Sequence, residues 1–319
     1  MTLLELVGQN IGSPAVLAFI LGALAVRLKS DLSFPESVTS LLSTYLLLAI
    51  GLKGGLRLRE AALDDLLLPI VGTVALGIVT PAITYWVARR FLKRTPSDSA
   101  ALAAHYGSVS AVTFTAAETF VKNAGTLGED YLAALVAVLE VPGIVVALLI
   151  ASRVLGKSTI KSAVHEVVTG RSVVLLIGGL VIGFVASEKS TALVEPLFVD
   201  LFAGVLVLFL LDLGVMAGSR LDAIRAAGAK LVVFAIALPV LFGFLGVVVG
   251  TAAGLSVGGV TVVATMAASA SYIAAPAAVR IGMPEADGGL ALGAALGITF
   301  PFNLVVGIPL YSELAGLVA

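Results

Sequence analysis

Two short stretches rich in hydroxyl groups interrupt an otherwise apolar chain. The first reads GSVSAVTFTAA (107–117) and the second reads ASASYIAAPAA (268–278). In each stretch two serines stand at positions i and i+2, which do not share a helix face, so both can act together only where a helix is interrupted. Pro276 favours such a break, because proline lacks an N–H and disfavours helical geometry in the residue before it. The serine pairs are Ser108 with Ser110 and Ser269 with Ser271.

Interrupted helices inside a membrane would offer two kinds of ligand. The N-termini of half-helices present free N–H groups and a partial positive charge, which suit a small anion. Freed carbonyls and hydroxyls suit a hard cation such as sodium, which prefers oxygen ligands. The alternative interpretation is that these hydroxyls only allow close helix packing and bond to their own backbone.

Ionisable side chains within apolar spans are costly and therefore point to function. Glu140 stands two residues before Pro142 in the middle of an apolar stretch, where a broken turn would let its carboxylate meet a cation. Asp212 lies in another apolar stretch, and both a proton-carrying role and a structural hydrogen bond are open for it. Glu118 is nearer the end of its stretch and is expected to be solvated, whereas His105 is expected to be packed, with its hydrogen bonds satisfied.

The composition indicates an integral membrane protein. Of the 319 residues 59% are hydrophobic and 12% are charged, and the mean hydropathy is +1.12, whereas about a quarter of residues are charged in soluble domains. The net charge of -1 and the absence of cysteine give no reason to expect a nucleic-acid partner, a disulfide framework or a thiolate metal site. Residues 1–12 lack Lys and Arg, so the first apolar segment is expected to stay as a span rather than be cleaved.

Known signatures of metalloproteases and ATP-driven pumps are missing. The chain has no HExxH sequence and no Gly-rich loop ending in Lys-Ser or Lys-Thr. We therefore predict that the protein is not an enzyme.

Charge clusters and turn signals divide the chain into ten candidate membrane-spanning helices, which predicts an all-α fold. The most polar connection, RVLGKSTIKSAVHEVVTGR, divides the ten into five and five. We predict a first five-helix repeat (1–153), a cytoplasmic connecting loop (154–170) and a second five-helix repeat (171–319). The predicted helices cover residues 11–28, 34–54, 62–91, 99–121, 130–153, 171–187, 197–217, 229–252, 256–281 and 287–311.

Similar features recur in the same order in the two halves. The segment AIGLKGGLRLRE (49–60) matches LDLGVMAGSRLDAI (211–224), and the hydroxyl-rich stretches fall in the fourth and ninth helices. LEVPG (139–143) and ITFPF (298–302) each place a proline in the middle of a span. Because five is odd, the second half enters the membrane from the opposite side, so the repeats are inverted. Inverted repeats with interrupted helices are typical of secondary transporters with a site near the membrane midplane.

The distribution of Lys and Arg predicts the orientation, because cytoplasmic loops carry the excess of these residues. One side holds five of the 19, namely Lys53, Arg57, Arg59, Lys122 and Lys189. The other 14 are Arg27, Lys29, Arg89, Arg90, Lys93, Arg94, Arg153, Lys157, Lys161, Arg171, Arg220, Arg225, Lys230 and Arg280. The side with 14 is predicted to be cytoplasmic, with both termini outside.

Five segments resemble the sodium-dependent bicarbonate transporters typified by the cyanobacterial SbtA proteins. These are IGLKGGLRLRE, GSVSAVTFTAA, LEVPGIV, AASASYIAAPAAVRIGMPEA and ALGITFPFNLVVGIPLY. The resemblance covers essentially the whole chain and is strongest in the ninth and tenth helices, where Arg280, Gly282 and Pro284 also match. It implies a homotrimer in the bacterial inner membrane that moves bicarbonate with sodium. Two inverted repeats would form a core domain that slides against a fixed gate domain, with the substrate between the broken fourth and ninth helices.

The resemblance also implies a set of site residues. The anion would lie against Gly107, Ser108, Ser110, Thr113, Ser269, Ala270 and Ser271. Sodium, the co-transported ion, would be bound by Ser110, Glu140, Ser271, Thr299 and Asn303. Asn303, one turn beyond Thr299, could instead make a helix–helix hydrogen bond.

Several residues depart from the family pattern. Ala270 replaces a serine, Tyr272 stands where the family has an acid, and Ala111 and Val112 stand where Gly and Ser are usual. A sodium- or proton-coupled transporter of another small anion, such as a short carboxylate, is therefore an alternative. A cation–proton antiporter using Glu140 and Asp212, and a membrane sensor without transport, are others. The family's PII-like regulator docks on the cytoplasmic side, but the central connection here is shorter than in the cyanobacterial members.

Overall fold

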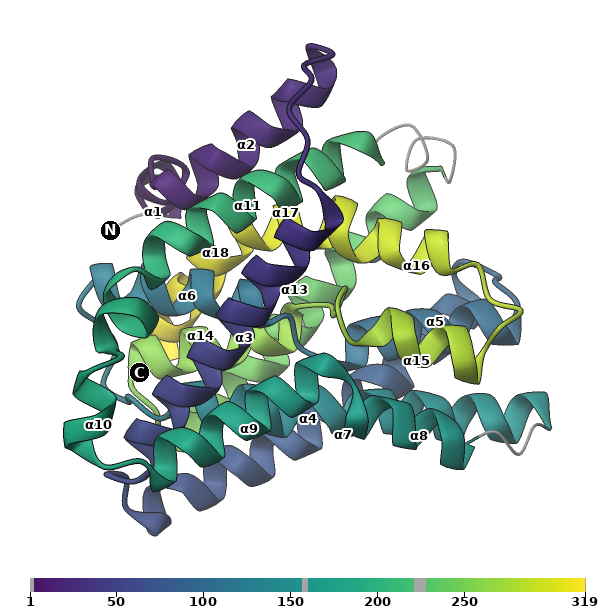
Figure 1. Cartoon of the computed structure of the whole chain (residues 1–319). Helices are drawn as coiled ribbons and strands as arrows, with labels where there is room; N and C mark the ends of the chain where they lie inside the picture. Colours follow the sequence, from purple (N-terminus) through teal and green to yellow (C-terminus); the bar gives the residue numbers. More distant parts are fainter. Residues whose placement is uncertain (1–2, 157–159, 221–227, 319) are drawn as a thin grey trace.

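The computed structural model describes residues 3–156, 160–220 and 228–318, and within these ranges the secondary structure is helical, without strands. Lys157 and Arg225, which the orientation argument counted on the cytoplasmic side, lie outside the described residues. The first half contains α1 (Leu3–Ile11), α2 (Pro14–Arg27), α3 (Glu36–Leu58), α4 (Leu63–Arg90), α5 (Pro96–Gly107), α6 (Ala111–Asn123) and α7 (Leu132–Leu155) (Figure 1).

The second half also combines long and short helices. It contains α8 (Ile160–Thr169), α9 (Arg171–Val185), α10 (Glu188–Ala192), the π-helical turn η1 (Pro196–Asp200), α11 (Phe202–Ser219), α13 (Ala229–Ala252), α14 (Val257–Ala268) and α15 (Ala275–Gly282). The last segment alternates α- and π-helical turns. It consists of α16 (Gly288–Ala294), η2 (Ala295–Thr299), α17 (Phe300–Phe302), η3 (Asn303–Gly307) and α18 (Ile308–Val318).

Six helices in the described ranges are long and apolar enough to cross a membrane, or up to eight if each of two bent pairs counts as one span. The pairs are α1 with α2, bent by 67°, and α8 with α9, bent by 50°. The expected membrane protein is thus supported, while the count of ten stays a prediction. Four helices, α5, α6, α14 and α15, have only 8 to 13 residues each.

The predicted helix at 229–252 coincides with α13, and most other predicted helices agree with the structure to within a few residues. Two differences stand out. The first helix starts at Leu3 and bends between Ile11 and Pro14, because Ser13 caps α2 by accepting a hydrogen bond from Val16 N. The segment expected to be a plain connecting loop contains α8, whose Ala163 and Val167 are buried against the rest of the protein.

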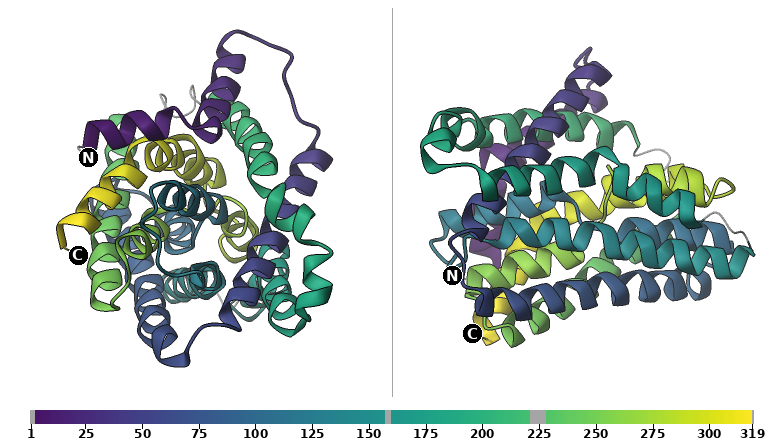
Figure 2. Two further views of the ribbon diagram at one scale, coloured as in Figure 1. Left: turned by 90° about the vertical axis from the view of Figure 1, so that its left-hand side faces the viewer. Right: turned by 60° about the horizontal axis from the view of Figure 1, so that its bottom comes forward.

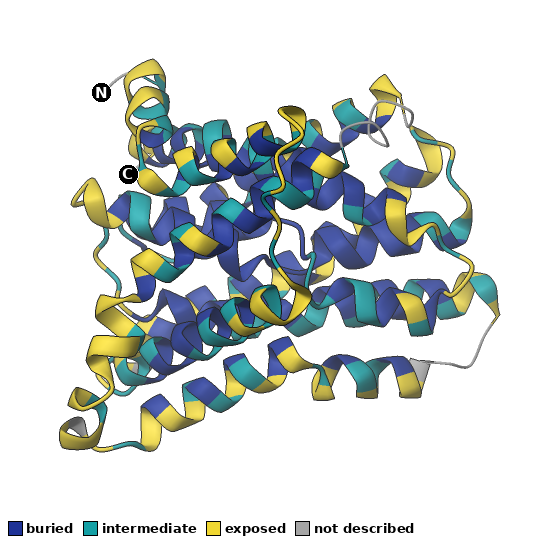
Figure 3. Ribbon diagram, turned by 45° about the horizontal axis from the view of Figure 1, so that its top comes forward, coloured by how far each residue is buried: buried dark blue, intermediate teal, exposed yellow. Residues whose placement is uncertain are grey.

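The helices pack in two groups. One group is α2, α3, α9 and α11, in which α2 packs against α11 and α3 packs against α9. The other group contains α4 to α7 and α13 to α18, in which α4 packs on α5 and α7, and α13 on α14. Figure 2 shows α2, α3 and α11 along one flank of the bundle. The middle of the molecule is mostly buried, and exposed residues follow the outer helices (Figure 3). Large apolar side chains such as Leu67, Val71 and Ile78 on α4 are exposed, as a lipid-facing surface requires.

Close backbone contacts hold the first group together at glycines. A Cβ atom built on Gly179 of α9 would lie 2.7 Å from Leu48 O and 3.1 Å from Gly51 Cα of α3. In the same way, a Cβ atom on Gly214 of α11 would collide with the carbonyl of Phe19 in α2. Small residues at such crossings let helix backbones approach, which is how helices associate inside membranes.

These contacts predict different outcomes for two adjacent glycines. Gly179→Ala forces two helix backbones apart and should lower the free energy of unfolding by about 1–3 kcal/mol, the usual cost of overpacking. Gly178→Ala is the matched control, because a Cβ there meets nothing within 4 Å, and alanine favours the helix by about 1 kcal/mol relative to glycine. Thermal unfolding of both variants in detergent measures the difference. Equal melting temperatures for the two variants would contradict the packing argument.

Candidate functional site

The first hydroxyl-rich stretch contains a break in helical structure. Helix α5 ends at Gly107, Ser108 is extended (φ −110°, ψ 154°) and so is Ser110 (φ −96°, ψ 112°), after which α6 begins. The Ser110 hydroxyl oxygen caps α6 by accepting a hydrogen bond from Thr113 N at 3.2 Å. The sequence predicts that Ser108 and Ser110 can act together only where the helix is interrupted. The extended backbone at both serines is such an interruption.

The second stretch is interrupted in the same manner. Helix α14 ends at Ala268, Ser269 is extended (φ −81°, ψ 170°), and α15 begins at Ala275. The Ser271 hydroxyl oxygen accepts hydrogen bonds from Ala274 N and Ala275 N, both at 3.3 Å. Ser271 thus supplies an acceptor for the free N–H groups at the start of α15.

The two interruptions are hydrogen-bonded to each other. Ser110 N donates to Ser269 Oγ at 2.9 Å, and Ser271 N donates to His105 O at 2.7 Å. The Ser269 hydroxyl in turn donates to Met266 O at 2.7 Å. Residues far apart in the sequence are thereby fixed into one site, and all four serines are at least 96% buried.

Glu140 of α7 reaches the first interruption. The Ser108 hydroxyl lies 3.1 Å from Glu140 O and 3.4 Å from Glu140 Oε2, and the Ser172 side chain of α9 lies near the carboxylate. Glu140 is buried, with 3% of its surface exposed, and within the described ranges no salt bridge reaches it. A buried carboxylate without a counter-ion is energetically costly, so the site favours a cation.

A small cavity lies where these groups converge. Its volume is about 10 Å³, which is roughly the space that one water molecule or one small ion needs. The Ser110 hydroxyl oxygen accepts one cap hydrogen bond, so its hydrogen and one lone pair are available to a ligand. The Ser271 hydroxyl oxygen accepts two, so its hydrogen is available but both lone pairs are engaged. The lining residues are Leu47, Val109, Ser110, Ala111, Glu140, Ser271, Tyr272 and Ile273.

Tyr272 fills part of the space where the family pattern has an acid. Its ring packs edge-on against Phe300, with centroids 5.6 Å apart. Its hydroxyl is buried beside Ser110 without a hydrogen bond of good geometry. The cavity is therefore bounded by a phenol rather than by a second carboxylate.

Thr299 and Asn303, two of the predicted sodium ligands, do not line this cavity. The Thr299 hydroxyl donates to Ala235 O and accepts from the Tyr106 hydroxyl, both at 2.7 Å. Asn303 Nδ2 donates to Ala268 O at 2.8 Å, the last carbonyl of α14. These contacts support the helix–helix role that the sequence left open for Asn303.

Three predicted anion-site residues occupy supporting positions. Gly107 packs so closely on α7 that a Cβ atom on Gly143 would collide with the Gly107 carbonyl. Thr113 contributes its N–H to the Ser110 cap. Ala270 is buried between the two serines but does not line the cavity.

The structure corrects the expectations for two ionisable residues. Glu118 is not solvated: it is 7% exposed and forms ion pairs with Lys53 and Lys122, because the lysine of α3 approaches it from a distant part of the sequence. His105 is packed as expected, but its Nδ1 has no hydrogen-bond partner in the described part of the chain. Asp212 makes the structural hydrogen bond that was one of its two options, accepting from Thr39 Oγ1 at 2.6 Å.

A serine in the pattern GxSxG, Ser256 in GLSVG (254–258), is explained by its contacts. Its hydroxyl donates to Glu129 Oε2 at 2.7 Å and caps α14 by accepting from Gly259 N at 3.1 Å. Ser256 thus joins Glu129 to the start of α14, a structural role for this serine.

Sequence reasoning missed Leu47, Ser172 and Lys53 as neighbours of functional groups. Only Lys53 carried a local signal, because a lysine inside an apolar span is itself unusual. Within the described residues no group of three or more His, Asp or Glu side chains could hold a metal ion. A sodium ion would therefore depend on hydroxyl and carbonyl oxygens besides Glu140.

The family model of the Na⁺-dependent bicarbonate transporter superfamily matches residues 14–316. Because this match covers nearly the whole chain, the protein belongs to that family. No curated protein matches the chain.

The hydrogen bond between the two interruptions predicts that removing the Ser269 hydroxyl costs more stability than removing the equally buried Thr265 hydroxyl. Ser269→Ala leaves Ser110 N without its partner and should lower the free energy of unfolding by about 1–3 kcal/mol. Thr265→Val is the matched control, because the equally buried Thr265 hydroxyl bonds only to Thr261 O within its own helix. Thermal unfolding of both variants tests this, and a larger loss in Thr265→Val would refute it.

Proposed function

We propose that the protein is a secondary active transporter that carries bicarbonate together with sodium by an elevator-type movement. Family membership supports a sodium-dependent bicarbonate transporter. The observation that carries the proposal is the small cavity in which two serine-capped helix starts and a buried carboxylate converge. Such a cavity offers donors to an anion and oxygen ligands to a cation at the same point.

The sodium ion would be held by Glu140 and the hydroxyl oxygen of Ser110. Ser271 would join them if its oxygen gave up one of its two long cap hydrogen bonds. Thr299 and Asn303 would support the ends of the interrupted helices instead, since their polar groups are engaged elsewhere. The anion would accept hydrogen bonds from the serine hydroxyls and lie near the positive ends of α6 and α15. Since the cavity of about 10 Å³ admits roughly one water-sized particle, bicarbonate binding requires the two interruptions to move apart from α3.

Glycine contacts support an inverted repeat of two five-helix halves, with α5–α6 and α14–α15 as broken fourth and ninth helices. When the two glycine-rich segments of the sequence are aligned, Gly51 of α3 corresponds to Gly214 of α11. Gly51 meets Gly179 of α9, and Gly214 meets the backbone of α2 near Gly22. A twofold rotation that exchanges the two halves would place α3 on α11 and α9 on α2. It would thus superpose the contact of α3 with α9 on the contact of α11 with α2, as inverted repeats require.

The two packing groups support the elevator movement. The group of α2, α3, α9 and α11 would be the fixed gate domain, and the remaining helices would form the core domain that carries the site. We further propose a homotrimer in the bacterial inner membrane, with both termini outside, consistent with the excess of Lys and Arg on the opposite side.

Transport of another small anion, such as a short carboxylate, is the second candidate. Tyr272 favours it, because a phenol beside Ser110 changes both the charge and the shape of the cavity wall. An antiporter using Glu140 and Asp212 has less support, since Asp212 is bonded to Thr39 within the α2, α3, α9 and α11 group and does not line the cavity.

Uptake of radiolabelled bicarbonate into proteoliposomes under an inward sodium gradient tests the proposal. We expect uptake with sodium but not with potassium or choline, and a fall of about tenfold or more in Glu140→Gln, since the loss of a charged ligand costs at least about 1.5 kcal/mol. Glu36→Gln is the control, because Glu36 is exposed at the start of α3.

Folded, inserted protein that accumulates no bicarbonate in any gradient would refute the assignment of the anion. A screen of small carboxylates on the same vesicles would then separate the second candidate from the first. Full sodium dependence in Glu140→Gln would instead remove Glu140 from the sodium site and leave bicarbonate transport standing.

A further inference from the structure

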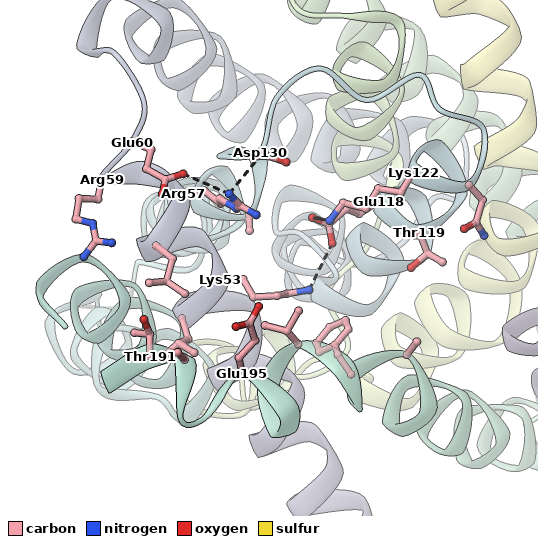
Figure 4. A pocket seen from close by; sticks show the side chains of 18 residues that line it. Lys53, Arg57, Arg59, Glu60, Glu118, Thr119, Lys122, Asp130, Thr191 and Glu195 are labelled. Carbon is pink, nitrogen blue, oxygen red and sulfur yellow. Dashed lines mark hydrogen bonds and ion pairs between the residues drawn. The ribbon is translucent and has the colours of Figure 1, made fainter. Parts of the chain in front are cut away.

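A second, larger cavity opens between α3, α6 and the segment from α10 to α11. Its volume is about 490 Å³, and eight of its 18 lining residues are charged (Figure 4). Its basic residues are Lys53, Arg57, Arg59 and Lys122, and its acidic residues are Glu60, Glu118, Asp130 and Glu195. The charges balance in number, so their pairing decides what the cavity can bind.

The pairing is uneven. Arg57 has two acidic partners, Glu60 at 3.3 Å and Asp130 at 3.9 Å. By contrast, Lys53 and Lys122 share the single carboxylate of Glu118 (Figure 4). Two ammonium groups around one carboxylate leave an excess positive charge at this end of the cavity, so a second anion there would be attracted to both lysines.

Lys53, Glu118 and Lys122 form a cluster. Within the cluster, Lys53 makes a weaker ion pair with Glu118 than Lys122 does. Lys122 Nζ donates to Glu118 Oε1 at 2.9 Å, whereas Lys53 Nζ lies 3.7 Å from Oε2. The second distance exceeds that of an ordinary hydrogen bond. An oxyanion entering the cavity can therefore offer Lys53 a shorter contact than Glu118 does.

Lys53 is also held in place and partly desolvated. Its side chain is 18% exposed, and Nζ lies 3.7 Å from the ring centroid of Phe202, an aromatic contact that favours a cation. Because the surroundings are less polar than water, its charge acts more strongly on a nearby anion than a fully exposed lysine would.

The large cavity and the small cavity share two walls. On α3, Leu47 lines the small cavity and Lys53 lines the large one, and on α6 the corresponding residues are Ala111 and Glu118. These pairs are six and seven residues apart, which is about 9 to 10.5 Å along a helix. Along both α3 and α6 the two cavities thus lie within about two helical turns of each other.

We propose that the cluster is a separate binding site for a small oxyanion, in which Lys53 and Lys122 bind the anion and Glu118 is its internal competitor. The anion displaces Glu118 from Lys53 before it passes to the small cavity. This inference rests on the proposed transport function and adds an outer binding site for the transported anion. The two cavities would then hold the same substrate in succession.

Charge-selective labelling tests the site without requiring transport. The chain has no cysteine, so Thr119→Cys places one thiol on α6 at the cavity wall. We compare its rates of reaction with a negatively charged sulfonate and a positively charged trimethylammonium methanethiosulfonate. Adding Lys53→Gln should lower the anionic-to-cationic rate ratio about threefold to fivefold, the effect of losing up to about 1 kcal/mol, and Glu118→Gln should raise it. Bicarbonate, replacing gluconate at constant ionic strength, should slow the anionic reagent.

Arg57→Gln is the matched control, because Arg57 is a cation of the same cavity that already has two acidic partners. It should change the rate ratio by less than half as much as Lys53→Gln. Equal effects of Lys53→Gln and Arg57→Gln on the rate ratio would overturn the proposal, because a general surface field would explain them. A change in the same direction in Lys53→Gln and Glu118→Gln would also overturn it, because loss of a structural salt bridge would explain that result. If Lys53→Gln does not fold, Lys122→Gln gives the same test at a more exposed position.

Uptake kinetics separate this proposal from the transport function. Lys53→Gln should raise the KM for bicarbonate about threefold or more without changing the maximal rate, and Lys53→Arg should restore it. If the Thr119→Cys protein with both lysines intact shows the charge-selective labelling but takes up no bicarbonate, and the wild-type protein takes up none either, the transported anion is refuted and the outer site is left standing. Normal uptake with no labelling effect of Lys53→Gln would refute the outer site alone.

Discussion

The structure depends on satisfying backbone polar groups where two helices are interrupted inside a membrane. No water in the hydrocarbon region can bond to free N–H and C=O groups, so the protein must supply every partner itself. Serine side chains and facing backbone do this: Ser269 Oγ accepts from Ser110 N, and the His105 carbonyl accepts from Ser271 N. Asn303 adds a donor for the last carbonyl of α14. The interruptions can exist only because they face each other.

This arrangement bears on the proposal that two ions of opposite charge bind at the small site. Glu140 is buried without a counter-ion among the described residues, which makes the empty site costly and favours a cation. Once a cation neutralises the carboxylate, the helix N-termini and the serine hydroxyls dominate the remaining field and favour an anion. In the proposed symporter, binding of the first ion would thus raise the affinity for the second, which is the reciprocal coupling that symport needs.

Local sequence patterns predicted the interruptions but not the contacts between them. Serines at i and i+2, with Pro276, are a local signal, and the extended backbone at Ser108 and Ser269 agrees with it. The burial of Glu118 could not be predicted in this way, because it depends on Lys53 approaching from another helix. The same holds for Thr299 and Asn303, whose partners Ala235 and Ala268 are set by tertiary packing. The sequence predicts a loop where α8 lies, because the short amphipathic pattern of this helix is polar enough to resemble a connection.

The two cavities differ in charge, and each is lined in part by residues of α3 and α6. The small cavity contains a carboxylate and no lysine or arginine, whereas the cluster in the large cavity contains two lysines around one carboxylate. In the proposed transporter an anion would therefore be favoured in the large cavity and repelled by Glu140 in the small one until a cation has bound there. The ion pair of Lys53 with Glu118 joins α3 to α6, one helix from each packing group, so in the proposed elevator it would be one of the contacts between the moving and the fixed domain.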